Sequence, residues 1–227
     1  MKPYLLPLAL LSLAACTPVA DDDDAGHHDP VDLEFTNSGD ASLEGHTPRG
    51  FQGQGTGIFA GDNINPNFPQ GDGVQIFLTL DFAEAEDGVP FVDEAHAWDS
   101  IDSAWLGSDN ASTSGTPFED LGDLILDEVE FDAFSSALFD IEPVAGGHSC
   151  VFATSADGPF GCDIEPIVTA ALEDGRTTAQ IRLRTEIAGD SDGAQDMILF
   201  HLGNSNETAR GIFHIDVSAV PAHVDAD

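Results

Sequence analysis

Residues 74 to 82 read VQIFLTLDF, and this stretch decides the fold class. Its apolar side chains fall on every second position, whereas a helix would need an apolar residue at every third or fourth position. Because successive side chains of a strand point to opposite faces, the pattern predicts a β-strand with one apolar face. The same alternation recurs along the chain. Further strands are predicted at 31–35, 101–106, 123–131, 137–141, 150–153, 178–185, 196–202 and 212–217.

Turn-forming residues separate these segments, as at 62–67 and 107–110, where Asp, Asn and Gly gather. Many short strands with such punctuation predict an all-β fold, namely an antiparallel β-sandwich of the jelly-roll type. One short helical turn is expected at 164–172. The 227 residues favour a single domain, with the sandwich at 31–220 and an acidic tail at 221–227.

The N-terminus has the features of an export signal at 1–15. Lys2 precedes an apolar run at 5–13 that is too short to cross a bilayer, which takes ~20 helical residues. Small residues follow this run, as they do before a cleavage site. The first residues therefore predict a signal peptide and an exported protein.

Residues 13–16, LAAC, resemble a bacterial lipobox. The resemblance implies cleavage before Cys16 and a lipid anchor on that cysteine. Thr17 stands where inner-membrane retention usually goes with Asp, which implies the outer membrane or cell surface. The alternative is a plain secreted protein. Residues 16–30 are then the lipidated cysteine and an acidic linker that repels itself and holds the domain off the membrane.

The charge balance excludes several classes of partner. The chain has 6 Lys and Arg against 42 Asp and Glu, which gives a formal charge of −36. Such a surface repels phosphate backbones, so we expect no nucleic acid as a partner and a membrane only through the lipid anchor. The 41% of hydrophobic residues, with 15 Phe among them, still suffice for a core.

The cysteine count agrees with export. With Cys16 assigned to lipid, Cys150 and Cys162 remain and should form a disulfide in an oxidising compartment. A turn signal at 157–159 lies between them, so the bridge is expected to clip a hairpin or a short loop.

Two arginines share one face of the strand predicted at 178–185. Arg182 and Arg184 alternate with apolar residues and therefore point away from the core. One interpretation is internal pairing with carboxylates. The other is a binding site for an acidic sugar, since a guanidinium group binds a carboxylate through two parallel hydrogen bonds.

Two tryptophans could provide a surface on which a sugar ring stacks. Trp105 alternates with Ile101, which predicts that it enters the core. Trp98 is then the surface candidate, and the predicted ligand-binding residues are Trp98, Arg182 and Arg184.

Three carboxylates surround a glycine turn at 190–196, in the sequence DSDGAQD. Calcium loops use oxygen ligands of this kind, so Asp190, Asp192 and Asp196 are candidate ligands for Ca²⁺ as the one conceivable cofactor. The segment lacks the bidentate Glu and the full spacing of an EF-hand. The alternative is a solvated acidic turn.

An ordered series of short motifs carries a family resemblance. The series runs through IDSAWL at 101–106, GTPF at 115–118, LG at 121–122, DIE at 163–165, IV at 167–168, AL at 171–172, Gly175, AQIRLR at 179–184, DSDG at 190–193 and the strand at 212–217. Over about 31–217 the chain resembles the disaggregatase-related (DNRLRE-type) domains. The resemblance implies a jelly-roll sandwich on exported proteins, with some members similar to carbohydrate-binding modules. This chain departs from the pattern in having no attached enzyme domain and few aromatic residues.

Enzyme motifs are thin. Residues 147–151, GHSCV, approach the nucleophile elbow, but Val151 replaces its last glycine. We therefore expect a non-catalytic envelope lipoprotein whose domain is a surface binding module, with polysaccharide as ligand. The alternatives are a structural or assembly partner of another envelope protein and a divergent polysaccharide-acting enzyme.

Overall fold

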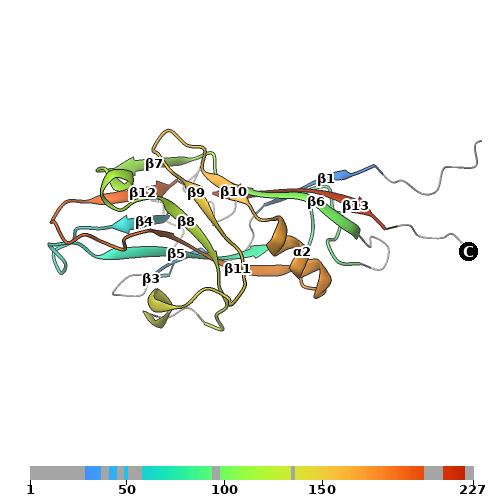
Figure 1. Cartoon of the computed structure of the whole chain (residues 1–227), viewed down its shortest axis with the longest axis horizontal. Helices are drawn as coiled ribbons and strands as arrows, with labels where there is room; N and C mark the ends of the chain where they lie inside the picture. Colours follow the sequence, from blue (N-terminus) through green and yellow to red (C-terminus); the bar gives the residue numbers. More distant parts are fainter. Residues whose placement is uncertain are drawn as a thin grey trace, which may run out of the picture.

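The computed structural model describes residues 29–36, 41–44, 49–50, 58–93, 98–133, 136–201 and 212–222. Two antiparallel sheets pack against each other as a sandwich, which confirms the predicted fold class (Figure 1). The predicted signal peptide, Cys16 and most of the linker and acidic tail lie outside the described residues.

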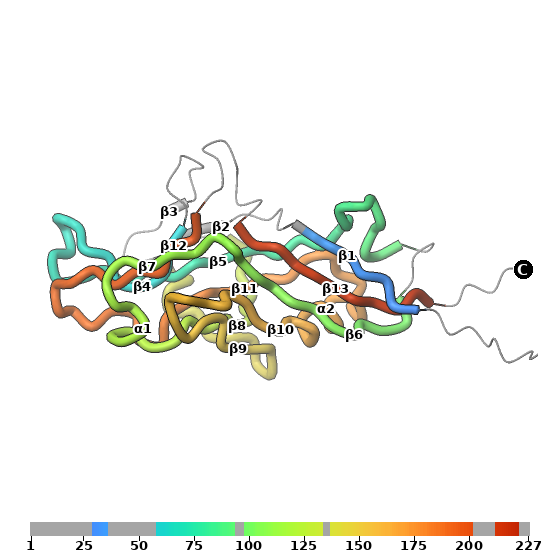
Figure 2. The backbone as a smooth tube through the Cα atoms, turned by 90° about the horizontal axis from the view of Figure 1, so that it is seen from above, coloured from blue at the N-terminus to red at the C-terminus, as the bar shows by residue number. Residues whose placement is uncertain are grey.

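The small sheet has four strands in the order β1-β13-β6-β10. They are β1 (Val31–Thr36), β13 (His214–Pro221), β6 (Trp98–Gly107) and β10 (Gly161–Asp163). β1 pairs with β13, so the first and last strands are neighbours, and Figure 2 shows them side by side with β6.

The large sheet has nine strands, seven of them in the order β7-β12-β4-β5-β11-β8-β9. These are β7 (Ala111–Ser114), β12 (Asp196–Phe200), β4 (Ile58–Asp62), β5 (Gly73–Asp81), β11 (Thr178–Thr185), β8 (Leu124–Glu128) and β9 (Ser149–Ala153). β2 (Ala41–Glu44) pairs with β5 and with β3 (Arg49–Gly50). The helices α1 (Pro117–Asp120) and α2 (Glu165–Glu173) and the 3₁₀ helix η1 (Ser136–Asp140) lie in the connections.

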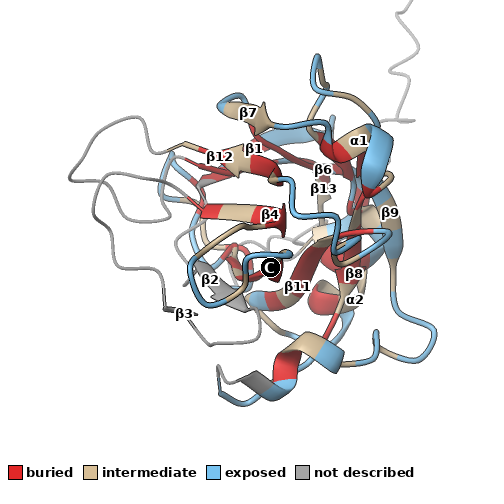
Figure 3. Ribbon diagram, turned by 90° about the vertical axis from the view of Figure 1, so that its left-hand side faces the viewer, coloured by how far each residue is buried: buried red, intermediate tan, exposed pale blue. Residues whose placement is uncertain are grey.

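The main core lies between the sheets, where Figure 3 shows the buried segments. β5 contributes Ile76, Leu78 and Leu80 to it, all fully buried. Next to them, Phe35, Phe82 and Phe91 pack edge to face with ring centroids 4.9 to 6.4 Å apart. The residues that the alternating pattern placed inside are therefore the residues that hold the sheets together.

A second, smaller core covers the outer face of the large sheet. Phe77 of β5 is fully buried there against Val129 and Leu138, so the central strand is buried on both faces. This corrects one prediction: the segment predicted as a strand at 137–141 is the 3₁₀ helix η1, because a single turn suffices to place Leu138 on Phe77.

The disulfide joins the two sheets. Cys150 of β9 and Cys162 of β10 are bonded, which confirms the predicted pair. β9 is the last strand of the large sheet and β10 the last strand of the small one. Of the two predicted alternatives the bridge therefore closes a short loop, not a hairpin within one sheet, and it holds two sheet edges together at a corner of the sandwich.

Removal of this bridge should lower stability without changing the fold. Replacing Cys150 and Cys162 together with Ala is expected to reduce the free energy of unfolding by about 3 kcal/mol, because the unfolded chain regains the freedom that a closed loop of this size removes. Urea unfolding of the two proteins measures the difference. Equal midpoints under oxidising conditions would contradict it.

Candidate functional site

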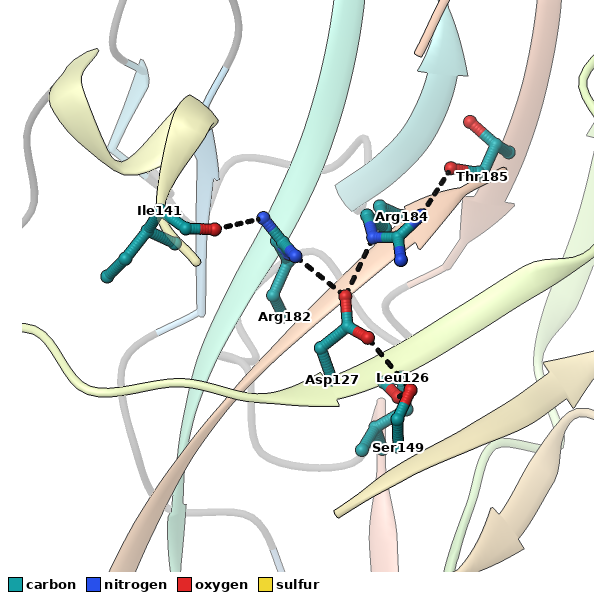
Figure 4. Close-up of polar contacts among 7 residues, drawn as sticks. All are labelled: Leu126, Asp127, Ile141, Ser149, Arg182, Arg184 and Thr185. Atoms are coloured by element: carbon teal, nitrogen blue, oxygen red, sulfur yellow. Dashed lines mark hydrogen bonds and ion pairs between the residues drawn. The ribbon is translucent and has the colours of Figure 1, made fainter. Parts of the chain in front are cut away.

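Arg182 and Arg184 share one carboxylate on the outer face of the large sheet (Figure 4). Arg182 Nη2 and Arg184 Nε each donate a hydrogen bond to Asp127 Oδ2, over 2.7 Å in both cases. The register explains the meeting, since Arg182 lies directly opposite Asp127 across β11 and β8. The sheet geometry thus brings two cations and one anion together.

Further contacts enclose this cluster. Arg182 Nη1 donates to the carbonyl of Ile141 over 2.8 Å, and Ser149 Oγ donates to the other carboxylate oxygen of Asp127 over 2.8 Å. The side chains of Arg182 and Asp127 are only 6% and 3% exposed, against 27% for Arg184. The cluster is an internal ion pair, as one of the two sequence interpretations stated. Recognition of an acidic sugar by these arginines has no support in this geometry.

The cluster also sets the titration of Asp127. Burial by itself would raise the pKa of this carboxyl group, but hydrogen bonds from Arg184 and Arg182 outweigh it and hold the pKa below its usual range. The carboxylate is therefore charged wherever the domain is folded near neutral pH.

The exposures of the two tryptophans are the reverse of those predicted. Trp105 is 40% exposed, whereas Trp98 packs against the main core and donates Nε1 to the carbonyl of Phe91 over 2.7 Å. The prediction that Trp98 is the exposed tryptophan is wrong. Trp98 also lies on the core side, while Arg182 and Arg184 lie on the outer face of the large sheet, so these three predicted ligand-binding residues do not form one site.

Two irregularities in β6 cause the exchange. β13 runs opposite β6, and the pairing shifts by one residue at Asp102 and again at Asp99. Each shift is a β-bulge, which reverses the side-chain alternation beyond it. Ile101 and Ala104 consequently both face the core, and Trp105, opposite the exposed Asp216, faces solvent.

Trp105 stands on a face that the sequence did not single out. An open hollow of about 400 Å³ lies on the outer side of the small sheet, and Trp105 lines it together with Asp32, Glu34 and Asp216. A second hollow of about 450 Å³ adjoins it through Glu34 and Asp216 and extends to Asp109. We call these two joined hollows the Trp105 groove.

Two glycines form the support of the indole. A Cβ atom on Gly161 would lie 2.7 Å from Trp105 Nε1, and one on Gly107 would lie 3.0 Å from the same atom. The two glycines are opposite each other across β10 and β6. The Nε1 edge of the ring therefore lies against backbone that carries no side chain, while 40% of the residue stays exposed.

The predicted calcium ligands make contacts of their own. Asp190 Oδ1 accepts the amide of Asp192 over 3.2 Å, and Asp192 Oδ1 accepts the amide of Ala194 over 2.6 Å. Asp196, 1% exposed, accepts the amide of Thr116 over 2.6 Å. Among the described residues no group of three or more His, Cys, Asp or Glu side chains is arranged to hold a metal ion. Calcium binding stays a prediction.

One buried carboxylate near this turn escaped sequence analysis. Asp62, at the end of β4, is 1% exposed and lies opposite Asp196. Burial raises the pKa of this carboxyl group above its usual value, and hydrogen bonds from the backbones of Asp72 and Ser191 offset only part of that rise. Gly71 and Gly189 approach this carboxylate so closely that a Cβ on either would lie within 2.9 Å of it. Asp62 therefore anchors the loop between β11 and β12.

Ser149, the serine of the segment that approaches a nucleophile elbow, makes hydrogen bonds within the fold. Ser149 Oγ donates to the carbonyl of Leu126 and to Asp127, and His148 Nε2 lies 2.7 Å from the carbonyl oxygen of Asp163. Neither contact pairs this serine with this imidazole. Ser149 therefore binds Asp127 of the ion cluster and pairs β9 with β8.

Loss of Asp127 should be costly because it strands a buried guanidinium group. Asp127→Ala is expected to lower the free energy of unfolding at pH 7 by about 3 to 5 kcal/mol, whereas Asp132→Ala, an exposed matched control, should change it little. The folded pKa of Asp127 is depressed, so its contribution is complete above the unfolded pKa of about 3.9 and is lost as pH falls through the folded pKa. Urea unfolding at pH 7 and pH 3 measures both effects, and a difference between wild type and Asp127→Ala that grew on acidification would contradict the assignment.

Helices among the described residues are all too short or too polar to cross a membrane. Comparison of the chain with models of known protein families finds no match, and comparison with curated proteins finds none either. The resemblance to DNRLRE-type domains therefore stays a prediction, and the function must be argued from the Trp105 groove.

Proposed function

We propose that the domain is a non-catalytic surface binding module that holds polysaccharide in the Trp105 groove. One observation carries this proposal: an exposed tryptophan, fixed on a glycine support, stands in a hollow on an open sheet face. Large exposed aromatic residues are costly to keep in contact with water, and one that lines a hollow suits a ligand that stacks on it.

Polysaccharide matches the groove in shape and chemistry. The C–H faces of a sugar ring pack on an indole, and the hydroxyl groups around the ring need hydrogen-bond acceptors. Asp32, Glu34 and Asp216 provide carboxylate oxygens beside the ring, and Ser103 and Ser218 provide hydroxyl groups. The hollow continues past Glu34 toward Asp109, so a ligand stacked on Trp105 has further surface along which to extend.

The predicted lipid anchor at Cys16 would hold this module at the outer membrane or cell surface. β1 begins at Val31, directly after the acidic linker, and Glu34 of the same strand lines the groove. A domain held by such a tether at the outer membrane or cell surface would present the groove to polysaccharide outside the membrane. The anchor remains part of the proposal.

Substitution of Trp105 tests the proposal. Trp105→Ala should weaken binding of the purified protein to its polysaccharide about tenfold or more, because the stacking surface is removed. Trp98→Phe, a control change at the partly buried tryptophan that packs against the main core, should leave affinity unchanged. Affinity electrophoresis through gels containing neutral, amine-bearing or acidic polysaccharides measures this.

Retardation that is equal for wild type and Trp105→Ala would contradict the placement of the site. Absence of retardation in every gel would contradict polysaccharide binding itself. Crosslinking in cells would then test the alternative, assembly with another envelope protein.

A further inference from the structure

We propose that the Trp105 groove selects sugars that carry a free amino group, such as polymers of glucosamine, over neutral and acidic sugars. The inference rests on the proposed function and adds the ligand class. It follows from which charges surround the indole, how close they lie to it, and which charges are missing from this sheet.

The register places carboxylates in a row with the tryptophan. Trp105 lies directly opposite Asp216 across β6 and β13, and Asp216 lies directly opposite Glu34 across β13 and β1. Residues opposite each other in antiparallel strands have Cβ atoms about 4.5 to 5.5 Å apart. A sugar stacked on Trp105 therefore has the Asp216 carboxylate within reach at its edge, and Glu34 one strand further.

These carboxylates are available to a ligand. Asp32, Glu34 and Asp216 are exposed, and the side chain of Asp216 is 57% exposed. Its contact with the imidazole of His214 is long, at 3.7 Å, and leaves room for a closer donor. An ammonium group brings three donors and a positive charge, so it satisfies such oxygens better than a neutral hydroxyl group does.

The small sheet has no arginine or lysine to attract an acidic sugar, and the imidazole of its histidine, His214 of β13, lies 3.7 Å from the Asp216 carboxylate. The sequences of β1, β6, β10 and β13 contain no arginine and no lysine. Arg182 and Arg184 belong to the other sheet and are held by Asp127. A carboxylated or sulfated chain would meet the carboxylates of Asp32, Glu34 and Asp216 with only the imidazole of His214 beside them in the groove, and like charges at such distances repel.

The indole favours the same ligand. The face of a tryptophan ring carries negative electrostatic potential, which attracts an ammonium group placed near it. An amino sugar thus combines three favourable terms at one position: ring stacking, cation–π attraction and ion pairing. A neutral sugar has only the first, together with ordinary hydrogen bonds.

The experiment compares glucosamine oligomers with their N-acetylated counterparts and with alginate oligomers, by calorimetry on the purified protein at about pH 6, where carboxylates are ionised and the sugar amines largely protonated. Wild type should bind the free-amine oligomer about tenfold or more tightly than the acetylated one, and the alginate oligomer most weakly. The double variant Glu34→Gln with Asp216→Asn should lose this preference while still binding the acetylated oligomer.

A matched variant controls for the acidity of the whole chain. Glu142→Gln with Glu173→Gln changes two exposed acidic residues outside the groove, so both double variants have the same net charge. The control should keep the wild-type preference. Equal loss in both variants, or no preference in wild type, would overturn the selection of amino sugars while leaving polysaccharide binding in place. No binding of any oligomer would overturn the proposed function as well.

Discussion

The ion cluster formed by Asp127, Arg182 and Arg184 is the interaction on which much of this structure depends. It ties β8 to β11, reaches β9 through Ser149, and holds the segment around Ile141 through a carbonyl. Removing ions from water is expensive, so such a cluster requires close partners in a fixed geometry, and among its buried atoms Arg182 Nε is left without a hydrogen bond. It also uses two of the chain's 6 lysine and arginine residues on the large sheet, while the strands of the small sheet contain neither residue type.

How far sequence predicts this fold depends on whether a strand is regular. β11 has the boundaries that alternation predicted, 178–185, because each of its faces has one consistent environment. β6 shows where the method fails: its bulges at Asp99 and Asp102 depend on the pairing with β13, which no local pattern contains. The bulges exchange the predicted exposures of Trp98 and Trp105. The candidate site therefore lies at Trp105 on the outer face of the small sheet and not at Trp98.

The segment at 137–141 failed for a related reason. Its apolar spacing fits a short strand and a single helical turn equally well. The helical turn forms because it packs Leu138 against Phe77 on the outer face of the large sheet. The alternation at 74–82 implied a polar outer face, but Gln75 is 5% exposed and Phe77 is fully buried. Packing of a distant segment on a sheet face depends on tertiary structure and cannot be predicted from a local pattern. The pairing of Cys150 with Cys162, by contrast, could be predicted from the number of cysteines and an oxidising compartment alone.

The acidity of the chain and the specificity of the groove are separate properties. At physiological ionic strength charges are screened over about 8 Å, so most of the 42 acidic residues lie too far from Trp105 to affect a ligand bound there. They give the protein a general attraction for cations, which salt weakens. The carboxylates in register with Trp105 act at contact distance, where screening is slight, and ring stacking does not depend on salt. Discrimination between ligands must therefore come from the row formed by Glu34, Asp216 and Trp105, and it should weaken less with added salt than the general attraction does.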